Sequence, residues 1–268
     1  MGSPVAPGGG RPYRELRSLR EDTLLTLRPD GPVVLQGPWG TRRLEVSAEA
    51  VREALRRMSY GPVSLTNVVP DYPDWDAVRG AGPSEDALRL RAVLAGLTHC
   101  VVASLATDGG SLLLSVVPLT RTGHREPRPG RPGERYRLSR YVWARSDRDG
   151  LRLESPVSGS RLELHGEAVA LLGALPVPPG PGLTVGQLAE RLAGRPPRAT
   201  VRAVLAYLVA AGVVVRSRPH PVSGRPEFAE DADPVYRSAA VRGAGLYRAS
   251  RAVEQSGELL RGWTRLAG

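Results

Sequence analysis

The sequence predicts an α+β protein made of two tandem copies of one module, each with a three-stranded sheet and three helices. Two matching blocks predict the duplication. The pentapeptide RAVLA occurs at 91–95 and again at 202–206, and RLEVSAEAV at 43–51 shares six of nine residues with RLELHGEAV at 161–169. A length of 268 residues also suits two domains of roughly 100–130 residues each.

Composition shifts mark the boundaries of these modules. The chain starts with a Gly/Pro-rich segment, and Pro, Gly and Arg dominate the stretch between the copies. The matching blocks lie 118 and 111 residues apart, so the first copy carries about seven additional residues, which we place in the loop-like string VVPDYPDWDAVRGAG. We expect a disordered lead-in over 1–20, a first module over 21–119, a linker over 120–135, a second module over 136–218, a loop over 219–234 and a helical tail over 235–268.

Period-two alternation predicts three strands in the second copy, at RYRLSRYVWARSD, GLRLESP and SRLELH. Three helices follow: GEAVALLGAL, then VGQLAERLAG after the N-cap residue Thr184, then a helix at about 197–211 before the C-cap residue Gly212. The run VVVRS is then typical of a strand.

The first copy gives a similar order. Its strands are expected at LLTLRP, PVVLQGP and TRRLEV, and its helices at AEAVREALRRM and SEDALRLRAVLAGL, with a loop-rich segment between them. A hairpin around Asp108–Gly110 follows. Three helices followed by a β wing are the winged helix-turn-helix pattern.

The basic net charge and the winged helix-turn-helix pattern together indicate DNA as one candidate partner. The net charge is +10, and a winged-helix protein reads base edges with its third helix. However, all 37 basic residues are arginine, which with abundant Ala, Gly and Pro is typical of a GC-rich genome. The helix expected at 197–211 is polar only at Arg198, Thr200 and Arg202, which favours a core helix over a reading helix. A DNA-binding transcription factor stays an alternative.

A small three-stranded sheet suits a peptide partner better. Its open edge beside a helix can take up an extended peptide as an additional strand. The candidate edges are 41–46 and 160–165, each expected to face the third helix, and their arginines would suit an acidic peptide. For any single arginine, a solvated position is the commoner role. The candidate peptide-binding residues are Arg42, Arg43, Arg161, Leu162, Glu163, Leu164, Arg198, Arg202 and Leu205, and we expect the second copy to keep the groove.

The string from YRLSRYVWARSD through RLELHGEAVALLGAL, followed by LTVGQLAERL and VRAVLAYLVAAGVVV, resembles the region that precedes the catalytic domain in SagB-type azoline dehydrogenases. The unit also resembles PqqD-like elements, which bind the leader peptides of precursors in ribosomal peptide (RiPP) biosynthesis. The likeness covers about 22–217. It implies that both modules are winged-helix/PqqD-like.

The same resemblance implies a role without catalysis. In SagB-type enzymes an FMN-binding domain with a catalytic Lys/Tyr pair follows this region, whereas here about 50 residues follow and the chain has no lysine. No active-site residue carries over, and FMN is expected only on a partner chain. The implied function is to bind a leader peptide, or act as a scaffold, and present the precursor of an azole or thiopeptide product to a nitroreductase-like flavin dehydrogenase. A structural subunit of that dehydrogenase without peptide binding is an alternative.

The residue patterns give little support to other chemistry. The four histidines, His99, His124, His165 and His220, lack metal-ligand spacing. The single cysteine, Cys100, can form no internal disulfide and is typical of a core residue. No glycine-rich phosphate motif, signal peptide or membrane-spanning run occurs, so no metal site and a cytoplasmic location are expected.

Overall fold

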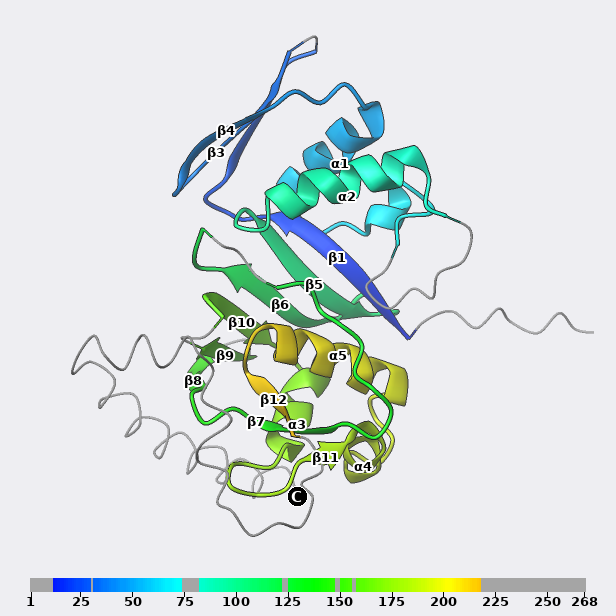
Figure 1. The fold of residues 1–268 in the computed structure, drawn as a ribbon, viewed down its shortest axis with the longest axis vertical. Helices are drawn as coiled ribbons and strands as arrows, with labels where there is room; N and C mark the ends of the chain where they lie inside the picture. Colours follow the sequence, from blue (N-terminus) through cyan, green and yellow to red (C-terminus); the bar gives the residue numbers. More distant parts are fainter. Residues whose placement is uncertain are drawn as a thin grey trace, which may run out of the picture.

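The structure, a computed structural model, describes residues 12–29, 31–73, 82–121, 125–147, 150–155 and 158–217 (Figure 1). Within these ranges the protein is a mixed α+β fold with antiparallel sheets and five α-helices. The loop expected over 219–234 and the helical tail expected over 235–268 lie outside the described residues.

A six-stranded antiparallel sheet runs through both predicted modules. Its strand order is β1-β5-β6-β10-β9-β8. At its centre β6 pairs with β10, with Leu162 opposite Val116, so the first and second halves of the chain share one sheet. The strands are β1 (Tyr13–Leu19), β5 (Val101–Thr107), β6 (Leu112–Pro118), β8 (Trp143–Asp147), β9 (Gly150–Ser155) and β10 (Ser160–Leu164).

Two smaller antiparallel sheets flank this one. The first has the order β2-β3-β4 and the second the order β11-β7-β12. In Figure 1 the sheet β2-β3-β4 stands apart from the six-stranded sheet, with α1 and α2 beside it. The strands are β2 (Leu24–Leu27), β3 (Val33–Gly37), β4 (Gly40–Leu44), β7 (Arg135–Leu138), β11 (Leu183–Thr184) and β12 (Val214–Ser217).

Two of the helices begin at capping residues that the sequence carries. The Ser84 hydroxyl accepts a hydrogen bond from the amide of Ala87 at the start of α2, and Thr184 forms a capping box with Gln187 at the start of α4. The C-cap of α5 is Ala211, and Gly212, expected as the C-cap, is the next residue and has a φ of 68°, the left-handed conformation that favours glycine after a helix. The helices are α1 (Glu49–Tyr60), α2 (Glu85–Gly96), α3 (Glu167–Ala174), α4 (Val185–Arg191) and α5 (Arg198–Ala210), with a 3₁₀ turn η1 (Leu65–Asn67).

Two apolar cores hold the layers together. In the first core, β3, α1 and α2 contribute Leu35, Leu55 and Leu90, each at most 1 % exposed. The second core joins α3, α4 and α5 to the six-stranded sheet and includes Leu162 and Leu205. Burial of these leucines and of the other side chains in each core supplies the main hydrophobic contribution to stability.

The order of elements is similar in the two halves. In each, a strand is followed by a meander of three strands and a helix, and later by a helix and a strand that pairs with the first one: β1 with β5, and β7 with β12. Two differences stand out in the described residues. The first half has a 3₁₀ turn where the second has α4, so two α-helices stand there instead of the three expected of the module. Among the described residues, the first half also continues into a further strand, β6.

Two expectations about strands need correction. Tyr13–Leu19 form β1, and the Tyr13 side chain is only 3 % exposed, so a disordered lead-in that extends to residue 20 is too long. The single strand expected at RYRLSRYVWARSD is two strands, β7 and β8, in different sheets. Between them the Ser139 hydroxyl accepts from the amide of Tyr141, which supports a turn.

Among the described residues, no helix has the length and apolar character that a membrane span requires.

Candidate functional site

The edge on which we expected a peptide in the second half is not free. β10 pairs with β6 on one side and with β9 on the other. The amide of His165 donates to the carbonyl of Leu113 at 2.9 Å, and by alternation along the ladder the amide of Arg161 also faces β6. Strand addition at 160–165 is therefore wrong, because the protein's own β6 occupies that edge.

The side chains of β10 make core and ion-pair contacts. Leu162 and Leu164 are fully buried, so the alternate residues Arg161 and Glu163 lie on the opposite face of the sheet. The Nε atom of Arg161 is 3.2 Å from the Oε1 atom of Glu163, and Arg152 lies 3.6 Å from the same oxygen. None of the four predicted β10 residues lines an open edge.

The predicted residues of α5 do not complete a site with β10 either. Leu205 is buried in the second core, and Arg198 pairs with Glu190 at 3.5 Å. Arg202 is exposed on α5, a helix that packs in the same core as Leu162. Because Arg161 points away from that core, the structure does not bring Arg161 and Arg202 together.

The corresponding edge in the first half is open. β4 is the last strand of the sheet β2-β3-β4, and no other strand in the described residues pairs with it. A two-residue turn joins Gly37 to Gly40, and such a turn closes on a hydrogen-bonded pair. The amides of Thr41 and Arg43 then point outward, where an added strand could accept their hydrogen bonds.

Arg42 and Arg43, the predicted residues of this edge, lie on different faces of the sheet. Arg42 is opposite Leu35, which is buried against the helices, so Arg42 lies on the helix-facing side. Arg43 lies on the other side and its Nε atom is 3.3 Å from Glu45. The structure thus keeps Arg42 as a candidate site residue and assigns Arg43 to a surface ion pair.

A cluster of cationic side chains surrounds the turn at the start of β4. The guanidinium of Arg20 lies 4.6 Å from the centre of a Trp39 ring, and Arg121 donates to the Trp39 carbonyl at 3.1 Å. The His99 ring meets Trp39 edge-on, with centroids 6.1 Å apart. We call Arg42, His99 and Arg121 the basic cluster.

His99 is only 9 % exposed, and its environment favours the neutral imidazole. Burial lowers its pKa, and the charges of Arg42, Arg121 and Arg20 lower that pKa further. The neighbouring Cys100 is buried and free, as expected of a core cysteine, and burial raises the pKa of its thiol.

The positive charge of the basic cluster is not balanced by nearby carboxylates in the described residues. Arg20 is neutralised by Asp22, whose carboxylate lies 2.6 Å away. Within the described part of the chain, Arg42 and Arg121 have no carboxylate within ion-pair distance. Two uncompensated guanidinium groups beside a neutral imidazole are suited to binding an anion.

The second half lacks this cluster. At the spacing of the two matching sequence blocks, Arg42 corresponds to Ser160, which is 1 % exposed, and His99 corresponds to Ala210. Of the two corresponding strands, β4 is therefore the one that combines an open edge with this basic cluster, because β10 is paired on both sides.

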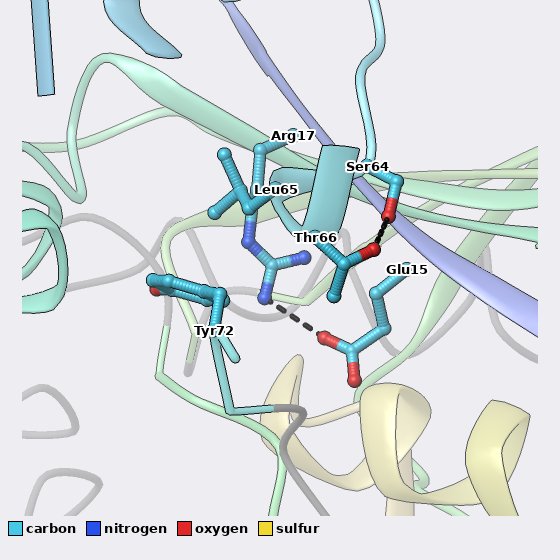
Figure 2. A pocket seen from close by; sticks show the side chains of 6 residues that line it. All are labelled: Glu15, Arg17, Ser64, Leu65, Thr66 and Tyr72. Carbon is cyan, nitrogen blue, oxygen red and sulfur yellow. Dashed lines mark hydrogen bonds and ion pairs between the residues drawn. The ribbon is translucent and has the colours of Figure 1, made fainter. Parts of the chain in front are cut away.

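A second polar group joins β1 to α5, and Figure 2 shows its β1 members, Glu15 and Arg17. Arg17 donates to the hydroxyl of Tyr207 and to the carboxylate of Glu15, and Tyr207 donates to Glu15, each at 3.2 Å. The adjoining cavity, lined also by Ser64 and Tyr72, has room for about one water molecule. This partly buried group joins the two halves, because Tyr207 of α5 bonds to Glu15 and Arg17 of β1, and the cavity beside it is too small for a ligand.

Sequence reasoning missed Trp39, Arg121 and the Glu15–Arg17–Tyr207 group. These contacts join segments that are about 60 to 190 residues apart, and no spacing pattern marks them. In the described residues, no three His, Cys, Asp or Glu side chains are grouped so that they could hold a metal ion.

Comparisons with known proteins add no assignment. No protein-family model matches the chain, and a search of curated proteins finds no match.

Proposed function

We propose that the protein is a non-catalytic peptide-binding protein that takes up an extended segment of a partner as an additional strand on β4. The observation that carries this proposal is the pairing of β6 with β10. It shows, inside the same molecule, an extended segment seated antiparallel on the edge that corresponds to the free edge of β4.

We further propose that the two halves are tandem modules of the winged-helix/PqqD-like kind. Support comes from the shared order of elements and from one repeated detail. Arg43 pairs with Glu45 as Arg161 pairs with Glu163, each with the glutamate two residues further along the strand. On this interpretation, β6 occupies in the second module the place that a peptide occupies in the first.

The biological context follows from the resemblance to the region that precedes the catalytic domain of SagB-type dehydrogenases. In this proposal the bound segment is the leader of a ribosomal precursor peptide, and a separate FMN-bearing dehydrogenase in the cytoplasm acts on its core. A precursor gene and a cyclodehydratase gene beside the gene for this protein would support that context.

Reading of DNA by the third helix is less well supported. Eight of the thirteen residues of α5 are buried, Thr200, Val201 and Leu205 among them. A helix that enters the major groove has to expose one polar face.

The test starts from peptides, because no ligand sequence is at hand. The purified full chain is panned against a displayed library of random 12-residue peptides at moderate salt, and enriched peptides are synthesised with a fluorescent label. We expect saturable binding, and slower hydrogen exchange at the amides of Thr41 and Arg43 when the peptide is bound. Arg43→Pro, which removes one outward amide, should abolish binding, whereas Arg43→Ala should not.

Two outcomes would refute strand addition on β4. One is the absence of any enriched peptide, and the other is a bound peptide that leaves the exchange of β4 unchanged. Copurification with a yellow flavin dehydrogenase in the absence of any peptide affinity would instead support a structural subunit.

A further inference from the structure

The basic cluster lies where a side chain of an added strand would point. Arg42 is on the helix-facing side of β4, and a residue paired with Arg42 would direct its side chain to that same side. In the second half, the residue paired with the corresponding Ser160 is Pro118, which is buried. A peptide side chain at this place would thus be close to Arg42 on the helix-facing side of β4.

We propose that Arg42, Arg121 and His99 bind the carboxylate of an aspartate or glutamate in the bound peptide. This inference rests on the proposed strand addition to β4 and names the chemistry that the edge selects. Both guanidinium groups lack a carboxylate partner in the described residues, and Trp39 positions Arg121 through its carbonyl. The ring of His99 makes no hydrogen bond to any described residue, so its N–H is free to donate to the carboxylate.

The pairing of β6 with β10 also predicts the neighbouring residue of the peptide. Val116 pairs with Leu162, which corresponds to Leu44 on β4, and Pro118 pairs with Ser160. Leu44 lies on the same side of β4 as Arg42 and packs against the first core. A peptide that runs in the direction of β6 therefore places an apolar residue against Leu44 and an acidic residue against Arg42, in the order apolar-x-acid.

A phosphate group could satisfy the same arginines, so the source of the anion has to be tested. We commit to a peptide carboxylate, because two guanidinium groups bind it with charge-assisted hydrogen bonds and its place in a strand is set by the register of β4. Phosphoserine at the same peptide position is the alternative source.

The experiment compares the random-peptide selection on the wild-type chain with the selection on Arg42→Gln and on Arg121→Gln. Arg43→Gln is the matched control, because Arg43 is adjacent but lies on the other face and pairs with Glu45. Enriched peptides are then synthesised in three forms that carry Glu, Gln or phosphoserine at the consensus acidic position, and their affinities are measured by fluorescence anisotropy.

We expect wild-type selections to enrich apolar-x-acid. The change from Glu to Gln in the peptide should weaken binding by about tenfold or more, the size expected of a charge-assisted contact. Arg42→Gln should remove most of this difference, and Arg43→Gln should leave it within about twofold.

Selected peptides that bind β4 with no preference for an acid, or equal affinity of the Glu and Gln forms, would overturn the carboxylate site and leave strand addition standing. Stronger binding of the phosphoserine form than of the Glu form would assign the cluster to phosphate and likewise overturn it. If no peptide is enriched at all, strand addition itself fails, and the carboxylate site falls with it.

Discussion

β4 and β10 are each the last strand of a three-stranded meander, yet only one of them has a free edge. The sequence RLEV around β4 and RLEL in β10 are nearly the same. β10 is interior because β6 pairs with it, whereas β4 ends its sheet. The sequence of a strand therefore does not show whether its edge is free, because this depends on pairing with a strand from elsewhere in the chain.

The same comparison extends to side chains. The Arg43–Glu45 pair on β4 has side-chain exposures of 69 % and 76 %, and the equivalent Arg161–Glu163 pair on β10 has 30 % and 32 %. The chemistry is the same, but the surroundings are not. An exposed pair contributes little to stability, whereas the partly covered pair of β10 is screened less by solvent.

The largest expected effect comes from proline at the two equivalent positions. Arg161→Pro removes an amide that faces β6 in the interior of the sheet and should lower the free energy of unfolding by about 3 kcal/mol or more. Arg43→Pro removes an amide at a free edge and should cost less than about 1 kcal/mol. Urea denaturation of both variants, with Arg161→Ala and Arg43→Ala as controls for the lost ion pairs, measures the difference. Equal costs would show that the two edges do not differ.

The contact of Tyr207 with β1 is a second link between the halves, beside the pairing of β6 with β10, and a substitution tests it. Tyr207→Phe removes a buried hydroxyl that accepts from Arg17 and donates to Glu15, and should destabilise the protein by about 1–3 kcal/mol. Tyr72→Phe is the matched control, because Tyr72 lines the same cavity and its hydroxyl makes no hydrogen bond to a described residue. Similar unfolding midpoints for the two variants would argue against this contact.

Alkaline pH should destabilise the protein, because the pKa values of Tyr207 and, at a separate place, Tyr136 are raised in the native state. Burial raises the pKa of Tyr207 above its ordinary value of 10, and burial and Glu134 raise that of Tyr136 to about 12. Between about pH 10 and 12 the unfolded chain loses these phenolic protons while the native protein keeps them, so stability falls as the pH rises. Thermal unfolding across this range should show a shallower fall for Tyr207→Phe. If stability falls with pH equally steeply in Tyr207→Phe and in the wild type, the raised pKa of Tyr207 in the native protein is contradicted.

The smallest effect concerns His99, beside the free edge. Since burial and then Arg42 lower its pKa below 6.5, Arg42→Gln should raise that pKa toward 6.5 while Arg43→Gln leaves it unchanged. The lowered pKa also means that the unfolded chain binds this proton more tightly, so His99 lowers stability as the pH falls through 6.5. NMR titration of the imidazole protons follows both variants. If the His99 pKa shifts equally in the two variants, Arg42 does not act on His99 more than Arg43 does, and Arg42 is not part of the basic cluster.

Local sequence signals predicted many elements correctly. The capping residue Thr184, the glycine Gly212 that follows the end of α5, and the period-two runs of β9 and β10 predicted elements close to those observed. The split of RYRLSRYVWARSD into β7 and β8 was missed, because the alternation continues through a turn that only pairing with β11 and β12 explains.

The sequence by itself determined the α+β class, most helices and several strands, the buried Cys100 and the arginines on the β4 edge, because these depend on signals within a few residues of the chain. The tertiary structure decided that β4 has a free edge while β10 does not, and it decided which side chains form the basic cluster. Those outcomes depend on β6 seating against β10 and on Trp39, His99 and Arg121 converging from distant segments, and such long-range packing leaves no periodic signal in the chain.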